Sequence, residues 1–137
     1  RVVSFMTDEL IQAWLDRAAD DLAVGKLVLE KGYTAYSCFL AHQAFEKTLK
    51  AFLIKRRVTH PRTHKLVDLV SECSTFDQAL SALLDGAIVL DQYYIPTRYP
   101  DATPGTLAEG LPSTKQANEA LKIAQDAFDS VSRLLAT

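Results

Sequence analysis

The longest unbroken apolar pattern in the chain runs from Cys38 to Ile54 and predicts a single helix. No Gly or Pro occurs between Thr34 and His60, and Ala, Leu, Glu and Lys dominate the stretch. At about 100° per residue, one broad face of this helix is apolar and carries Cys38, Ala41, Phe45, Leu49, Phe52 and Leu53. Apolar residues also occur on the opposite side. We therefore expect the helix to be central in the fold, or covered on its far side by a partner chain.

Apolar residues spaced three and four apart predict a helix before this one. It is expected to begin at a capping Thr7 and to run to about Lys31. Gly32 then occupies the C-cap position, where glycine permits a tight reversal of the chain. The first two helices should consequently pack antiparallel.

Three more helices are expected after Pro61. A short one passes through Leu66 and Cys73, and a capping box over residues 75–78 predicts the start of a fourth helix that runs to Tyr94. A second capping box, over residues 113–116, opens the last helix. The sequence shows no strand alternation and no internal repeat. It predicts an all-α, antiparallel up-and-down bundle of four long helices plus one short helix, in a single domain over residues 1–137.

Composition narrows the possible functions only slightly. The 137 residues carry a formal net charge of −2, so a nucleic-acid site would have to be a local basic patch. Cys38 and Cys73 lie in apolar helical patterns without metal-ligand spacing, which favours buried thiols in a reducing compartment. No apolar run approaches the roughly 20 residues of a membrane span, and the N-terminus lacks a signal-peptide pattern. We expect a cytoplasmic protein with no membrane contact, no metal site and no cofactor.

The first candidate for chemistry is a polar strip on the central helix, formed by His42, Gln43, Glu46 and Lys50. Glu46 and Lys50 are four residues apart, with the acid on the N-terminal side, which favours an ion pair. Two interpretations are open. The strip is either a surface pair beside a packed histidine or the lining of a ligand pocket or dimer groove.

The second candidate is a basic cluster at the end of the central helix and in the loop that follows. Such a cluster suits phosphate, for which Arg is a bidentate partner, although it also suits a helix C-terminus followed by a solvated loop. Six residues separate Arg57 from His64, and an Arg with a His can cleave RNA without a metal. The members of the cluster are Lys55, Arg56, Arg57, His60, Arg62, His64 and Lys65.

The third candidate is the stretch from Tyr93 to Asp101, at the start of a Pro- and Gly-containing loop that extends to Pro112. Its tyrosines can stack on a base while Arg98 holds a phosphate. Alternatively, the tyrosines cover the end of the bundle and Arg98 pairs with Asp101. Long loops in compact domains are usually functional or mobile.

In combination these stretches resemble the HEPN domain (higher eukaryotes and prokaryotes nucleotide-binding). The similarity lies in Ala41-His-Gln-Ala-Phe-Glu-Lys-Thr-Leu-Lys50, in Thr63-His-Lys-Leu66, and in Tyr94 followed by Thr97-Arg-Tyr-Pro-Asp101. The three occur in the family's order and the similarity covers about Leu10 to Leu135. It implies a helical bundle that commonly dimerises and is often encoded beside a small nucleotidyltransferase, as a toxin–antitoxin-like or defence pair.

The resemblance also implies either nucleotide binding or metal-independent RNA cleavage. Ribonuclease members of the family carry an Arg and, after it, a His that is separated from it by four to six residues. Arg98 lies where that Arg falls, but residues 102–105 are Ala-Thr-Pro-Gly, without a His. Arg57 and His64 have the family's spacing at a different place in the chain.

These observations favour a homodimeric HEPN-type module that binds a nucleotide or an RNA phosphate. Lys50 and Arg57 are expected to meet the phosphate beside His64, Arg98 to clamp it and Tyr99 to stack on a base, with His42, Gln43 and Glu46 as the supporting polar strip. One alternative is an endoribonuclease that uses Arg57 or Arg98 with His64. The other is an interaction module that only holds a nucleotidyltransferase partner.

Overall fold

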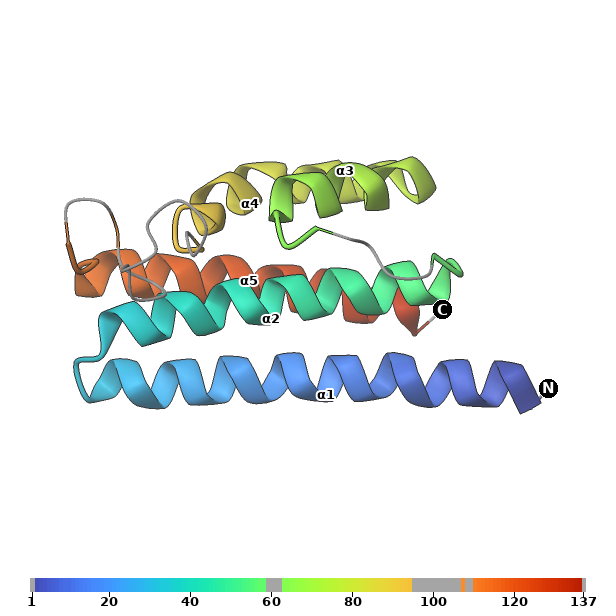
Figure 1. The fold of residues 1–137 in the computed structure, drawn as a ribbon, viewed down its shortest axis with the longest axis horizontal. Coiled ribbons are helices and arrows are strands. Elements are labelled where there is room, and N and C mark those ends of the chain that lie inside the picture. The colour runs from blue at the N-terminus through green and yellow to red at the C-terminus, as the bar shows by residue number, and fades with distance from the viewer. Residues whose placement is uncertain (1, 59–62, 95–106, 108–109, 137) are drawn as a thin grey trace.

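Three long helices lie side by side, and a hairpin of shorter helices covers one face of them (Figure 1). The computed structural model describes residues 2–58, 63–94, 107 and 110–136. The long helices are α1 (Val2–Glu30), α2 (Thr34–Lys55) and α5 (Thr114–Leu135). The hairpin consists of α3 (Leu66–Phe76), the 3-10 helix η1 (Gln78–Leu83) and α4 (Leu84–Asp91). It lies on the side of α2 and α5 that faces away from α1.

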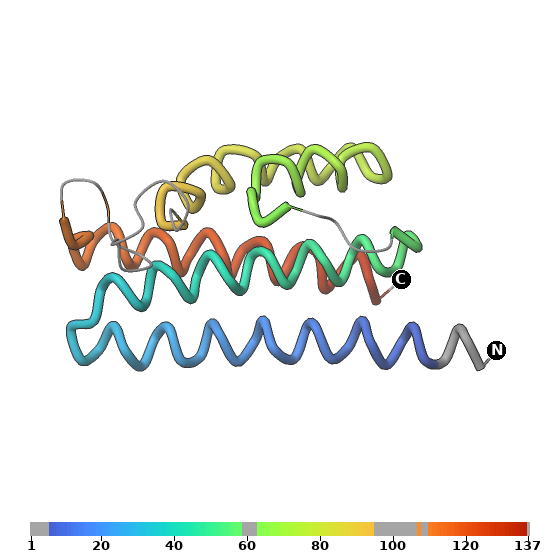
Figure 2. Tube along the Cα trace, viewed as in Figure 1, coloured from blue at the N-terminus to red at the C-terminus, as the bar shows by residue number. Residues whose placement is uncertain are grey.

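Successive long segments alternate in direction, as an up-and-down bundle requires (Figure 2). The chain runs along α1, returns along α2, reverses again through η1 and α4, and ends along α5. The described residues form no strand, only an isolated bridge between Leu107 and Gly110. The predicted all-α bundle is therefore confirmed. In the described part of the chain, no helix is long and apolar enough to span a membrane.

The reversal between α1 and α2 depends on Gly32, as predicted. Gly32 has a φ of 87°, and its N–H donates to the carbonyl of Leu29 at 2.9 Å. The N–H of Tyr33 donates to the carbonyl of Val28, also at 2.9 Å. This pair of bonds is a Schellman motif, which closes the end of a helix through a left-handed residue.

Two predicted helix starts are wrong. α1 begins at Val2 rather than at Thr7, because no Gly or Pro precedes Thr7 to stop the helix. Thr75 does not open the fourth helix; its hydroxyl donates to the carbonyl of Glu72 at 2.6 Å, near the end of α3. Asp77 caps the next element instead, since its carboxylate accepts from the N–H of Ala79 at 3.0 Å.

The fourth predicted helix is consequently shorter than expected. It starts as the 3-10 helix η1, continues as α4 and ends at Asp91 instead of Tyr94. The capping box at the start of α5 is confirmed. Ser113 accepts from the N–H of Gln116 at 3.1 Å, and the side chain of Gln116 accepts from the N–H of Ser113 at 2.8 Å.

α2 is the central helix, because it packs against α1, α3, α4 and α5. Its apolar face forms the middle of the core through fully buried side chains that include Phe45, Leu49 and Leu53. The far side of α2 is thus covered by this chain itself. Cys38 and Cys73 are free thiols in the same core, as predicted, and burial raises the pKa of Cys38 to about 11 despite a hydrogen bond with Tyr93.

The side chain of Asp91 ties the end of α4 to the start of α3. Its two carboxylate oxygens accept from the backbone N–H groups of Leu66 at 2.8 Å and Val67 at 3.1 Å. Burial of Asp91 opposes its ionisation, but His42 and these two N–H groups outweigh burial, so the pKa of Asp91 lies below its ordinary value of 3.8. A carboxylate at a helix N-terminus is also favoured by the helix dipole.

We predict that Asp91→Asn lowers the free energy of unfolding by about 1 kcal/mol at neutral pH, because the charged cap of α3 is lost. The folded pKa lies below the unfolded one, so ionised Asp91 stabilises the protein above pH 3.8, and this contribution is lost as the pH falls through the folded pKa. Urea unfolding at neutral and acidic pH should therefore show the two proteins converging below about pH 4. Asp126→Asn, at an exposed acid, is the matched control. A difference that is the same at every pH contradicts the prediction.

The end of α2 has the same hydrogen-bond pattern as the end of α1, but with an arginine in the left-handed position. Arg57 has a φ of 63°; its N–H donates to Ile54, and that of Val58 donates to Leu53, both at 2.9 Å. A left-handed conformation costs a non-glycine residue roughly 1–2 kcal/mol. Arg57 therefore carries backbone strain in an exposed position.

Replacing Arg57 by glycine should relieve this strain. We expect Arg57→Gly to be more stable than Arg57→Ala by up to about 1 kcal/mol, since both variants lose the guanidinium but only glycine accepts a positive φ freely. Chemical denaturation of the two variants measures the difference. An alanine variant as stable as the glycine variant would show that the left-handed conformation is not strained.

Candidate functional site

The polar strip of α2 is buried against the start of α3 and the end of α4. His42, Glu46 and Lys50 follow one another at intervals of four residues, so they lie on one face of the helix. His42 is fully buried, Glu46 is 5% exposed, and the side chain of Lys50 is 17% exposed. The strip is thus not a surface ion pair. Its polar atoms must find partners inside the protein.

Glu46 holds two basic groups together. Its Oε2 accepts from Nζ of Lys50 at 2.5 Å and from Nδ1 of His64 at 2.9 Å. An ionised carboxylate only accepts hydrogen bonds, so Nδ1 of His64 carries the hydrogen. Nε2 is then the ring atom through which His64 can exchange a proton or meet a ligand, and the side chain of His64 is 60% exposed.

His42 lies between two carboxylates at the buried end of the strip. Its Nε2 is 3.6 Å from Oδ1 of Asp91, and its Nδ1 is 3.9 Å from Oε1 of Glu46. Both separations exceed hydrogen-bond length but allow electrostatic attraction. Nε2 of His42 and Oε1 of Glu46 are buried and have no hydrogen-bond partner among the described residues. Gln43 contacts Nδ1 of His42 at 3.4 Å.

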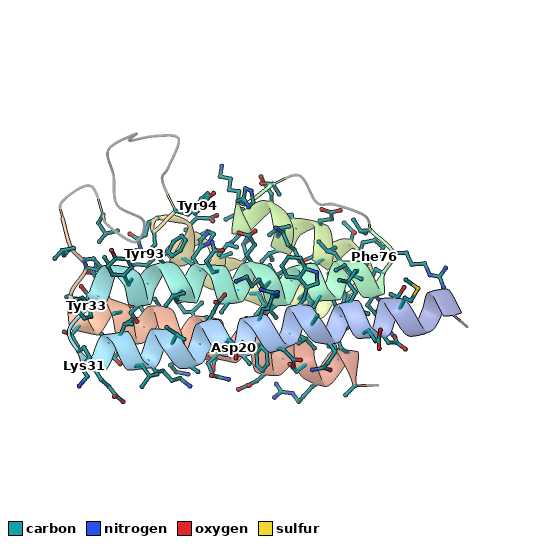
Figure 3. All side chains as sticks on the ribbon, turned by 60° about the horizontal axis from the view of Figure 1, so that its bottom comes forward. Asp20, Lys31, Tyr33, Phe76, Tyr93 and Tyr94 are labelled. Carbon is teal, nitrogen blue, oxygen red and sulfur yellow. The ribbon has the colours of Figure 1, made fainter. Side chains whose placement is uncertain are left out.

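Tyr94 covers both histidines. Its ring stacks on His42 with centroids 4.9 Å apart and planes at 14°, and it meets His64 at 5.7 Å and 43°. Figure 3 shows Tyr93 and Tyr94 at the end of α4, and Tyr93 is buried in the core. On the other side of the strip, Nζ of Lys50 lies 5.8 Å from the ring centroid of Trp14 on α1, a cation–π distance. These six side chains, His42, Glu46, Lys50, His64, Asp91 and Tyr94, are called the polar cluster below.

The structure brings together some of the predicted site residues. Lys50 and His64 meet on Glu46, with His42 and Gln43 beside them. Arg57 is exposed at the end of α2, about two helical turns beyond Lys50, and does not join the polar cluster. Arg98 and Tyr99 lie outside the described residues, as do His60 and Arg62.

Sequence reasoning missed Asp91 as a member of this site. A usable signal was present, because a carboxylate in the last turn of a helix is disfavoured by the helix dipole, and Asp91 follows the apolar run 87–90. Asp91 is stabilised there by its contacts with the N–H groups of α3 and with His42 on α2. Tyr94 was within the third candidate stretch, but its stacking on His42 was not foreseen.

The chemistry available to the polar cluster is that of an oriented imidazole beside an ammonium group. A buried carboxylate fixes the ring of His64, which can then act as a proton donor or acceptor, while Lys50 supplies positive charge. Within the described residues, no group of three or more His, Cys, Asp or Glu side chains is placed to hold a metal ion. The ammonium group of Lys50 and the half-exposed ring of His64 are the groups of the cluster that can donate to an anion.

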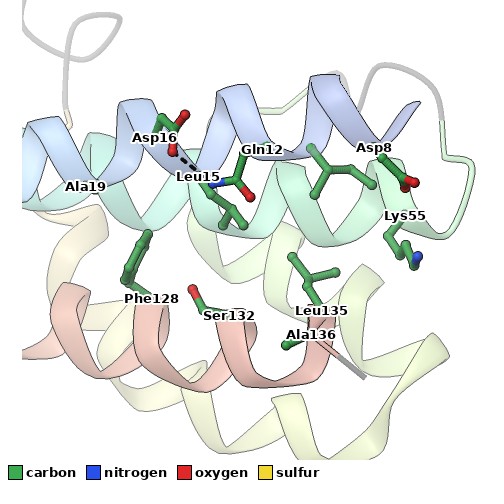
Figure 4. Close-up of a pocket in the computed structure, with 11 residues that line it drawn as sticks. Asp8, Gln12, Leu15, Asp16, Ala19, Lys55, Phe128, Ser132, Leu135 and Ala136 are labelled. Carbon is green, nitrogen blue, oxygen red and sulfur yellow. Dashed lines mark hydrogen bonds between the residues drawn. The ribbon is translucent and has the colours of Figure 1, made fainter. Parts of the chain in front are cut away.

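Away from the polar cluster, a cleft of about 460 Å³ lies between α1 and α5 (Figure 4). Ile11, Leu15, Phe128 and Leu135 contribute apolar surface to it, and none of the polar cluster lines it. Asp8, Asp16 and Lys55 also line it, so this cleft is separate from the polar cluster in both position and residues.

The HEPN domain family is matched by this chain over residues 11–134. No curated protein matches it at a significant level. Among solved structures, TT1696 from Thermus thermophilus is 33% identical, with a TM-score of 0.75 over 90% of this chain and 96% of that one.

Two further solved structures bear the family's name. ST0689, described as an archaeal HEPN homologue, is 26% identical with a TM-score of 0.72, over 90% of this chain and 96% of that one. An HEPN domain protein from Thermotoga maritima is 25% identical with a TM-score of 0.70, over 90% and 98%. Since the family match spans nearly the whole sequence and the fold agrees, the chain belongs to the HEPN domain family.

Proposed function

We propose that this chain binds the phosphate group of a nucleotide or of RNA at the exposed side of the polar cluster. The observation that carries the proposal is the pairing of Lys50 and His64 on the buried carboxylate of Glu46. This pairing fixes two basic side chains of different elements next to each other before any ligand arrives. Preorganised donors lose little freedom on binding, which favours affinity.

Each basic group keeps a polar atom for the ligand. Lys50 has three ammonium hydrogens, and one hydrogen bond to Glu46 leaves the others for phosphate oxygens. Nε2 of a protonated His64 donates to phosphate in the same way. The exposed side chains of Lys55, Arg56, Arg57 and Lys65 extend the positive charge beyond the cluster, which favours a ligand with several phosphates.

Arg98 and Tyr99 are close enough to Tyr94 along the chain to reach the polar cluster. They follow Tyr94 by four and five residues, so their Cα atoms lie within about 14 Å and 18 Å of that of Tyr94 in any conformation of the chain. We propose that Arg98 clamps a phosphate and Tyr99 stacks on the base, because base stacking on aromatic rings tolerates any sequence.

The binding proposal predicts weaker ligand affinity in three variants. His64→Ala, Lys50→Ala and Arg98→Ala should each weaken binding of a short fluorescent RNA, or of a nucleoside triphosphate, by about tenfold, since each removes a charge-assisted hydrogen bond. Fluorescence anisotropy and ligand-dependent thermal shift, both in EDTA, measure the effect. Lys122→Ala is the matched control, because Lys122 is an exposed lysine of α5 paired only with Asp126 in the described part of the chain.

Equal affinities for the parent, His64→Ala and Lys122→Ala would contradict the site. If the parent itself binds neither ligand, the result favours the alternative in which the chain is an interaction module. Its basic and aromatic surfaces would then hold a nucleotidyltransferase. That partner would then co-purify with the chain. We propose the same partnership, in a toxin–antitoxin or defence-like pair in the cytoplasm, as the biological setting of the phosphate site.

The bond between Glu46 and His64 also supports a second candidate function, a metal-independent endoribonuclease. A carboxylate that accepts from Nδ1 orients an imidazole so that Nε2 can take a proton from a ribose 2′-hydroxyl. Arg57 or Arg98 would stabilise the charge that develops on the phosphate.

Cleavage of mixed-sequence RNA in EDTA tests this alternative. If the chain is a ribonuclease, His64→Ala should lower the rate at least about 100-fold, and Glu46→Gln should lower it while leaving the RNA bound. Parent protein that binds RNA without cutting it excludes the enzyme. Cutting that persists in His64→Ala would point to a contaminating nuclease or to another catalytic residue.

A further inference from the structure

The single tryptophan of the chain lies beside the polar cluster but on a different helix. Trp14 belongs to α1, which runs alongside α2 (Figure 1), and Nζ of Lys50 lies 5.8 Å from the centroid of its ring. The indole is half-buried, because it packs against a small apolar group that includes Ala51 of α2. An aromatic ring at the edge of a basic site is suited to stack on a nucleobase.

A second cation lies on the side of Trp14 that faces away from the core. Arg17 follows Trp14 by three residues, so the two side chains are neighbours on the surface of α1. At about 100° per residue, Arg17 is turned further than Trp14 from the buried residue Ala18, and it is exposed. Lys50, Trp14 and Arg17 thus alternate cation, aromatic ring and cation across two helices. We call these three residues the Trp14 row.

Two acids lie near the row, and neither forms an ion pair with its cations. Asp21 is paired with Lys47 of α2 at 2.6 Å. Asp20 follows Arg17 by three residues, but no ion pair joins them, and none joins Arg17 to any other residue that the structure describes. The guanidinium of Arg17 therefore keeps its five N–H donors for a ligand.

The order of the groups in the row matches a single strand of RNA better than a mononucleotide. Within a strand, each base is attached to a ribose that has a phosphate on both sides. With that base on Trp14, one phosphate meets Lys50 and His64 of the polar cluster, and the other meets Arg17. Basic side chains interleaved with stacking aromatic rings hold single strands in this way without reading their sequence.

We propose that Trp14 is a base-stacking platform and that the Trp14 row extends the phosphate site onto α1, so that the ligand is single-stranded RNA with phosphates on both sides of the stacked base. This inference rests on the proposed phosphate site, because Lys50 belongs to both. The competing role for Trp14 is to hold the ammonium group of Lys50 through the cation–π contact. Holding Lys50 affects every phosphate ligand, whereas stacking affects only a ligand that carries a base.

An RNA oligomer and its abasic counterpart separate the two roles. Since the chain has one tryptophan, its emission reports directly on Trp14. A short oligoadenylate should quench this emission on binding, whereas an abasic ribose-phosphate oligomer of the same length should bind without quenching it. By anisotropy of labelled oligomers, Trp14→Leu should weaken oligoadenylate binding about tenfold and leave the affinity for the abasic oligomer unchanged. Trp14→Tyr, which keeps an aromatic ring, should restore most of the loss.

Salt dependence tests the phosphate contact of Arg17. Arg17→Ala should reduce the slope of log affinity for oligoadenylate against log salt concentration by about 0.7, because one phosphate contact is lost, and should leave the quenching in place. Arg133→Ala is the matched control, since Arg133 is an exposed arginine of α5, and it should leave the slope unchanged.

Oligoadenylate that binds without changing the emission of Trp14 would overturn the stacking role and leave the phosphate site standing. Equal weakening of both oligomers by Trp14→Leu would do the same, because Trp14 would then act only by holding Lys50. Adenosine monophosphate bound as tightly as oligoadenylate would overturn the strand as ligand. If the parent binds neither oligomer, the phosphate site itself fails, and the stacking platform fails with it.

Discussion

The buried carboxylate of Glu46 is the interaction on which the candidate site depends. α2 packs against four other helices, so a charged side chain in its middle has little access to water and must be satisfied within the protein. Lys50 pairs with its Oε2 from the same helix, and His64 does so from the segment before α3, while Oε1 faces Nδ1 of His42 at 3.9 Å. The hydrogen bond to Glu46 thus holds the ring of His64 beside Lys50.

The same requirement connects the helical hairpin to the three long helices. His42 lies between Glu46 and Asp91, and Asp91 in turn caps α3 through the N–H groups of Leu66 and Val67. Tyr94 closes the group by stacking on His42. A side chain that stabilises the hairpin thus also shapes the site. A change at Asp91 is expected to alter both the stability of the fold and the chemistry of the cluster.

The part of this arrangement that sequence predicted is the part that depends on local periodicity. The unbroken apolar pattern of 38–54 identified α2 as central, and the four-residue spacing placed Glu46 and Lys50 on one face. Gly32 and the box at Ser113 were found because their chemistry acts within a few residues. The sequence also placed His64 among the basic candidates, although not on Glu46.

Two features could not be predicted from the sequence. One is contact between side chains that are far apart in the sequence, and the other is which of two suitable residues caps a helix. Asp91 meets residues 24 and 25 positions away, and no local pattern encodes that contact. Thr75 and Asp77 can both cap a helix, and tertiary packing selects Asp77. The left-handed conformation of Arg57 could not be predicted either, because an arginine in the sequence does not indicate a positive φ as a glycine does.

The most direct measurement is a long-range ¹H–¹⁵N NMR spectrum of the histidine side chains during titration with a short RNA. If Glu46 orients His64 toward a phosphate, the spectrum of the free protein will show hydrogen on Nδ1 of His64. Its Nε2 resonance will then move in proportion to the RNA bound. An Nε2 resonance of His64 that stays fixed while RNA saturates the protein would contradict a phosphate site at the polar cluster.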